Sequence, residues 1–204
     1  MPANLVSQIV RTTTALLNDV NDSVIGDSST AGTGASQFIG QLGQRVALGP
    51  DEVRFDSAIG TLYGGVYQYV RFGVTEAVTP ALGLLAFWDG AVADDLYQVT
   101  TTEPTGVSDI AGIILNAVTK GNYGFIQTAG KATVKFKGTT TKTTPAVGDL
   151  VVAAADATAT ADVLADATAL TSVQARHILG IALAAPVGGA ASTVRLRTPW
   201  MSSV

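Results

Sequence analysis

The feature that most constrains the fold is a stretch of strict alternation, KATVKFK, at Lys131–Lys137. Its apolar residues take every second position, namely Ala132, Val134 and Phe136. Because successive side chains of a strand point to opposite faces, this spacing predicts a β-strand with one buried face and one solvated face. Gly138 and the threonines Thr139–Thr141 then predict a loop.

Other segments repeat this arrangement of short strands and turns. Residues Val66–Gly73 are aromatic and β-branched and follow the pair Gly64-Gly65, which favours a second strand. Pro145–Asp149 predicts a turn before a strand at Leu150–Val152. Short strands separated by frequent turns are typical of a sandwich or closed barrel. We therefore expect a mainly β fold of the β-barrel type.

An internal repeat supports a β fold. The segments Ile110–Gly121 and Ile178–Gly189 align without gaps. They share six positions: Ile110/Ile178, Gly112/Gly180, Ile113/Ile181, Leu115/Leu183, Ala117/Ala185 and Gly121/Gly189. A glycine inside an apolar strand usually marks a bulge or a tight bend. The repeat predicts two structurally similar β units within one domain.

The chain divides by composition into an N-terminal arm and linker (residues 1–50), a barrel-like domain (51–198) and a short tail (199–204). Near-helical spacing of apolar residues favours a helix in the arm, whereas Val10 and Thr12–Thr14 favour an extended arm, and both remain open. Residues 26–43 are rich in Gly, Ser and Thr and are typical of a linker. Four apolar residues before position 50 are candidate interface residues: Leu5, Ile9, Leu16 and Phe38. Residues 153–169 are predicted to form a surface loop that contains one short strand near Asp162–Ala165.

Composition excludes several classes of protein. Hydrophobic residues make up 47% of the chain and charged residues only 14%, so the chain as a whole is not expected to be disordered. A net charge of −4 argues against nucleic-acid binding through overall charge. The absence of cysteine excludes thiolate catalysis and cysteine-ligated metals. The apolar stretches are shorter than the roughly 18–20 residues that span a bilayer, and we expect neither a membrane segment nor a secretory signal.

Catalytic motifs are not convincing. Gly130-Lys131 lacks the glycine spacing and the following Ser or Thr of a phosphate-binding loop. Asp94 and Asp95 are successive residues, which on a strand would face opposite ways. His177 has no sequence-indicated partner for general base catalysis. We therefore expect no enzyme activity, no cofactor and no metal, with an Asp94, Asp95 or His177 hydrolase as the alternative.

The lysines are clustered. All five lie between Lys120 and Lys142, a stretch that contains no acidic residue. Two interpretations remain open, a solvated strand face or a basic surface that meets an acidic partner. Aromatic residues are not interleaved on the lysine face, which argues against nucleic acid. Three of these lysines are candidate interface residues: Lys131, Lys135 and Lys137.

Five motifs occur in the second half of the chain, which are Gly121–Gln127 (GNYGFIQ), Thr128–Val134 (TAGKATV), Gly148–Val152 (GDLVV), Leu179–Ala182 (LGIA) and Val194–Arg197 (VRLR). Through these motifs the chain, from Gly112 onward, resembles the head-decoration, or capsid cement, proteins of tailed bacteriophages. The resemblance spans about Tyr63 to Arg197 and leaves the first 50 residues uncovered. These motifs are structural rather than catalytic.

The resemblance implies a non-enzymatic β-barrel or β-tulip protein, usually a homotrimer, on the outer surface of a phage capsid. Its expected partners are the major capsid protein and further copies of itself, without nucleic acid or membrane. Two alternatives remain: a head-fibre or receptor-binding adhesin that contacts the host surface, and another structural virion part such as a tail-tube or baseplate subunit.

Overall fold

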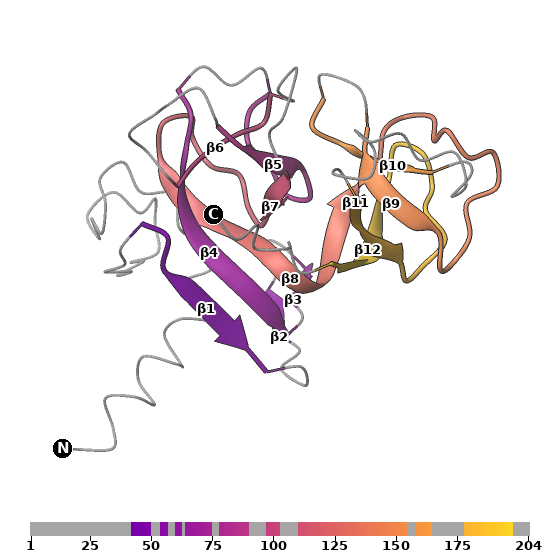
Figure 1. Ribbon diagram of the computed structural model, residues 1–204, viewed down its shortest axis with the longest axis horizontal. Helices are drawn as coiled ribbons and strands as arrows, with labels where there is room; N and C mark the ends of the chain where they lie inside the picture. The colour runs from indigo at the N-terminus through magenta and orange to yellow at the C-terminus, as the bar shows by residue number, and fades with distance from the viewer. Residues whose placement is uncertain are drawn as a thin grey trace, which may run out of the picture.

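The computed structural model describes residues 42–49, 54–56, 60–62, 64–74, 78–89, 97–102, 110–154, 158–164 and 178–197. Every regular element in these ranges is a β-strand, which confirms the expected mainly β fold. The strands, labelled in Figure 1, are β1 (Arg45–Leu48), β2 (Arg54–Asp56), β3 (Gly60–Leu62), β4 (Gly65–Phe72), β5 (Leu85–Trp88), β6 (Gln98–Thr100), β7 (Ile110–Ile114), β8 (Tyr123–Lys135), β9 (Leu150–Ala153), β10 (Ala161–Val163), β11 (Ile178–Ala182) and β12 (Ala191–Leu196).

Five strands close a barrel, which we call the first barrel. Around its ring the order is β4, β6, β5, β7 and the N-terminal half of β8, which returns to β4. All these pairings are antiparallel except that between β4 and β6. β1 pairs with β4 from outside the ring, and β2 and β3 form a separate two-stranded sheet. The closed barrel confirms the predicted architecture.

A second ring, which we call the second barrel, continues from the first. The C-terminal half of β8 pairs with β12, β12 with β11, β11 with β9, and β9 with β10. A single parallel bridge between Phe136 and Ala161 completes this ring. Figure 1 shows the two barrels as adjacent lobes, with β8 running from one into the other.

The crossing of β8 from one barrel to the other depends on Gln127 and Gly130. The buried amide of Gln127 donates hydrogen bonds to the carbonyl oxygens of Ala129 (3.2 Å) and Lys131 (3.0 Å). Gly130 has a φ of 98°, and a β-carbon there would lie 2.7 Å from the α-carbon of Gly65. Only glycine allows the two backbones to approach so closely at a positive φ.

The two barrels repeat one another in register. Ile113 lies opposite Gln127 in the first barrel, and Ile181 lies opposite Arg195 in the second, each 68 positions later. In both copies the register shifts at the residue before the strand glycine, Gly112 in β7 and Gly180 in β11. The predicted similar units, with a bulge at each glycine, are therefore confirmed.

The repeat also includes a turn, which was not recognised as repeated from the sequence alone. Thr79–Leu85 (TPALGLL) and Thr144–Leu150 (TPAVGDL) each precede the strand that pairs with β7 or β11. The amide of Gly83 donates to the carbonyl of Ile114 at 2.9 Å, and that of Gly148 donates to Ala182 at 2.8 Å. Both glycines have positive φ, 79° and 91°. The shared T-P-A-x-G-x-L pattern in the sequence could have indicated that these two turns are equivalent.

One hydrophobic core runs through both barrels. The alternation predicted for Lys131–Lys137 is confirmed, because Ala132, Val134 and Phe136 are at most 1% exposed. The strand predicted at residues 66–73 is β4, and the turn before Leu150 is present. β10 is the short strand expected near Asp162.

Most of the predicted arm (residues 1–50) and the tail (199–204) lie outside the described residues. The helix-or-extended alternative for the arm falls there as well. Residues 45–48 are described, and they form β1, which pairs with β4 over Gly65–Gln68. The sheet therefore begins before position 51, where the sequence placed the start of the barrel domain.

Candidate interaction surface

The outer side of the β8–β12 pair carries a row of cationic and small side chains. Its members, which we call the basic face, are Lys131, Thr133 and Lys135 of β8, Ala191, Thr193 and Arg195 of β12, and Arg197 just beyond it. In the antiparallel register Lys131 lies opposite Arg195, Thr133 opposite Thr193, and Lys135 opposite Ala191. Directly opposite residues project from the same side of a sheet, so these side chains share one surface.

Three of the four cations of the basic face are exposed, and Lys131 is half-buried. Lys135, Arg195 and Arg197 are exposed, whereas Val134 and Val194, which alternate with the face residues, are fully buried. The period of two along a strand separates these groups. Burial on one side fixes the backbone, so the cationic side chains project from a rigid support.

The equivalent face of the first barrel is aromatic and covered. Tyr67 and Tyr69 of β4 and Phe125 of β8 have no exposed surface. The ring of Tyr69 lies 5.2 Å from that of Phe125, centroid to centroid. Leu42 and Val46, at the start of the described chain, pack against this cluster. Burial raises the pKa of the Tyr67 hydroxyl.

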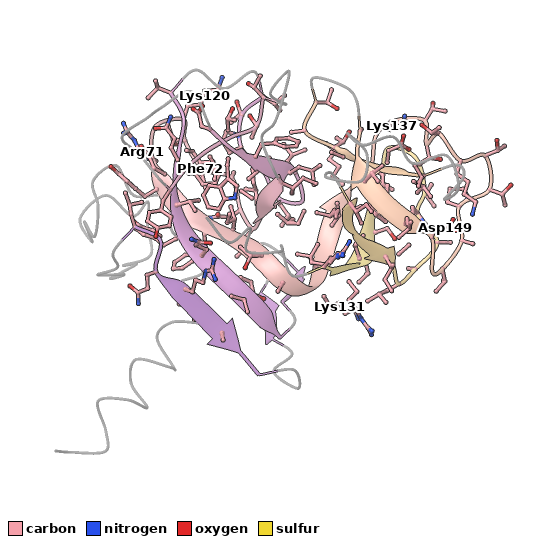
Figure 2. The ribbon with its side chains drawn as sticks, viewed as in Figure 1. Arg71, Phe72, Lys120, Lys131, Lys137 and Asp149 are labelled. Carbon is pink, nitrogen blue, oxygen red and sulfur yellow. The ribbon has the colours of Figure 1, made fainter. Side chains whose placement is uncertain are left out.

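Lys137 does not belong to the basic face. Its ammonium lies 2.6 Å from a carboxylate oxygen of Asp162 on β10, and it also donates to the hydroxyl of Thr141. Figure 2 places Lys137 on the far side of the second barrel from Lys131. Lys137 thus ties the end of β8 and the threonine loop to β10.

Asp162 is the centre of this internal cluster. Desolvation alone would raise its pKa, but hydrogen bonds from Lys137, from both the hydroxyl and the amide of Thr141, and from the amide of Val163 outweigh that effect. The pKa of Asp162 is therefore held below its ordinary value. The charged carboxylate is the stable form, and it holds the loop in place.

Lys142, another lysine of the predicted cluster, forms a second ion pair. The Lys142 ammonium lies 2.6 Å from an oxygen of Asp149, and this hydrogen bond is the largest cause of the lowered pKa of Asp149. The amide of Ala146 also donates to Asp149 at 2.8 Å. Lys142 therefore closes the turn before β9.

The structure brings together only part of the predicted interface. Lys131 and Lys135 lie on the basic face with Arg195 and Arg197, which the sequence reading did not select. The alternation of Val194–Arg197 was the available signal, because it places both arginines on one side of β12. Leu5, Ile9, Leu16 and Phe38 lie outside the described residues, as do Asp94, Asp95 and His177.

Neither a metal-binding cluster nor a membrane-spanning helix occurs among the described residues. No cluster of three or more His, Cys, Asp or Glu side chains there is arranged to hold a metal ion. Within the same ranges, no helix is long and apolar enough to cross a membrane.

Comparison with known proteins found few similarities. No protein-family model matches the chain, and neither does any curated protein. Among solved structures, the N base of the head fiber gp8.5 in bacteriophage phi29 is similar, with a TM-score of 0.41 and 17% sequence identity. That alignment covers 67% of this chain and 98% of the phi29 chain.

Proposed function

We propose that the protein is a structural component of a tailed-phage virion. In this role it binds the outside of the capsid where major capsid subunits meet, and it stabilises the shell without catalysis or a cofactor. The open basic face carries the proposal, since it is a rigid cationic surface on a chain with a net charge of −4.

The motifs of the capsid-cement resemblance support this proposal by their positions. Gly121–Gln127 forms a turn with a positive φ at Gly121 (84°) and the first part of β8. Thr128–Val134 continues β8, and Gly148–Val152 forms a second positive-φ turn and then β9. Leu179–Ala182 lies in β11 and Val194–Arg197 begins in β12. Every motif occupies a strand or turn of the barrels.

The composition of the basic face suits attachment to a shell. Covering the face orders four long cationic side chains, which costs rotamer freedom, whereas the short Ala191, Thr133 and Thr193 add little to that cost. Many copies on a repeating lattice add avidity, so that weak contacts at each site suffice. We further propose that the chain acts as a homotrimer, with the apolar residues of the arm, such as Leu5 and Ile9, contributing to subunit or capsid contacts.

The test mixes the full-length chain with phage shells that lack it and, separately, with unassembled capsid subunits. We expect cosedimentation with shells, little binding to free subunits, and a higher temperature of shell disruption. A trimer should appear in analytical ultracentrifugation. A chain that ignores shells and binds host cells instead would overturn the proposal in favour of the adhesin alternative.

A further inference from the structure

We propose that the docking surface is the outer side of the second barrel, comprising Lys131, Lys135, Arg195 and Arg197, and that its partner is an acidic protein surface. The identity of that partner as a capsid protein rests on the proposed function, whereas the location of the surface rests on the fold alone. Lys137, which is ion-paired to Asp162, is not part of the docking surface.

The first barrel serves as an internal reference for this assignment. The repeat places Lys131 at the position of Tyr67, Thr133 at that of Tyr69, and Arg195 at that of Gln127. In the first barrel the centre of this surface is the aromatic cluster of Tyr67, Tyr69 and Phe125, and Leu42 and Val46 of the same chain pack on it, while Arg71 stands at the position of Lys135. Apolar side chains are needed where a surface is permanently covered by its own chain.

The corresponding surface of the second barrel lacks those apolar residues. Thr193 stands where the first barrel has Phe125, and Ala191 stands where it has Tyr123. Exposed cationic side chains beside short residues suit a surface that loses its water only when a partner of opposite charge binds. The contrast between two faces in the same fold therefore indicates an intermolecular role for the second one.

The spacing of the charges fits an extended acidic surface. Lys131 and Lys135 are four residues apart on β8, which corresponds to about 13 Å along a strand. Arg195 lies across the strand pair from Lys131. The amide of Arg197 donates to the carbonyl of Leu179 at 2.9 Å, which continues the β12–β11 pairing by one residue, so Arg197 follows Arg195 on the same side. Arginine guanidinium groups bind carboxylates in a bidentate manner, which favours Asp and Glu side chains as partners.

A nucleic acid fits less well than an acidic protein surface. Binding of single-stranded nucleic acid usually adds aromatic stacking, and the basic face offers Ala and Thr between its cations. An acidic surface on a different protein is the partner that we propose.

The test uses the full-length triple variant K135Q/R195Q/R197Q and the single variant R195Q, and R45Q is the control that matches R195Q in charge. Arg45 is an exposed arginine on β1 of the first barrel, outside the basic face. The probes are immobilised poly-L-glutamate, a 20-base-pair DNA duplex at equal charge concentration, and phage shells that lack the protein. Circular dichroism and a melting curve verify that each variant is folded, and the single variant R195Q serves if the triple variant is not.

We expect the triple variant to bind both poly-L-glutamate and shells about tenfold more weakly or worse than the unaltered chain and R45Q, with the difference shrinking at high salt. Equal binding of poly-L-glutamate by the unaltered chain, R45Q and the triple variant would contradict the proposed docking surface. Tighter binding to DNA than to poly-L-glutamate would overturn the choice of partner.

The shell experiment separates the two proposals. If no protein binds shells but poly-L-glutamate binding depends on the basic face, the proposed function fails and the docking surface stands. If the triple variant binds shells as well as R45Q does, the docking surface fails and the proposed function stands.

Discussion

The first and second barrels share their inner faces and differ in their outer ones. Val70 and Phe72 point into the first barrel, and Val134 and Phe136 occupy the matching positions of the second, all at most 1% exposed. In Figure 2 Phe72 lies inside the first barrel and Arg71 at its edge. The strand glycines and bulges are also repeated. The comparison shows that inward residues and backbone geometry specify the barrel, while the outer face is free to acquire a separate role.

The largest expected effect comes from exchanging residues between the two outer faces. Tyr69→Thr removes a fully buried ring and should lower the free energy of unfolding by about 3 kcal/mol. Thr133→Tyr adds a ring at the matching position of the second barrel, and we expect a change within about 0.5 kcal/mol. Urea unfolding measures both. Similar losses for the two variants would mean that the second outer face is also covered in the isolated chain.

A smaller effect should follow from a side chain at the strand glycines. A β-carbon at Gly180 would fall on the carbonyl oxygen of Arg195, and one at Gly112 would lie 2.6 Å from that of Gln127. Gly180→Ala and Gly112→Ala should each cost about 2 kcal/mol, because the paired strands must move apart. Gly138→Ala is the control, since nothing lies within 4 Å of its added carbon. Thermal melts in which Gly180→Ala matches this control would contradict the close approach.

The Asp162 cluster has no counterpart among the described residues of the first barrel, and it predicts a dependence on pH. Asp162→Asn should lower the free energy of unfolding by about 1–2 kcal/mol at pH 7. The folded-state pKa lies below the ordinary 3.8, so the carboxylate stabilises the fold above that pH and loses its contribution as the pH falls through the folded value. The stability curves of the two proteins should therefore converge below pH 3.8. A constant difference down to lower pH would contradict the role of the charge.

The smallest effect on stability is expected at the basic face itself. Arg195→Gln removes an exposed charge opposite Lys131 and should change the free energy of unfolding by no more than about 0.5 kcal/mol. Arg45→Gln, an exposed site on the first barrel, should be equally neutral. Unfolding curves at low and high salt provide the measurement. A large loss with Arg195→Gln alone would assign Arg195 a structural role and weaken the contrast between the faces.

Much of the fold was predictable because strand alternation and glycine position are local. The burial of Phe136 and the bulges at Gly112 and Gly180 followed from spacing within a few residues. The interface was predictable only in part. Lys131 and Lys137 are an even number of residues apart, which would place them on the same face of a continuous strand. The regular strand ends at Lys135, however, and Lys137 pairs with Asp162. That contact joins residues 25 positions apart, and neither short-range pattern nor composition indicated it.

The sequence by itself determined which side of each strand is buried, because a period of two places apolar side chains on one face regardless of the partner strand. Only the tertiary structure decided which outer face is covered and which is open. Pairing of β1 with β4 and of β8 with β12 depends on long-range contacts, and these bring Leu42 and Val46 over the tyrosines but set Arg195 beside Lys131. The basic face exists because two strands that are distant in sequence align their cations in one register.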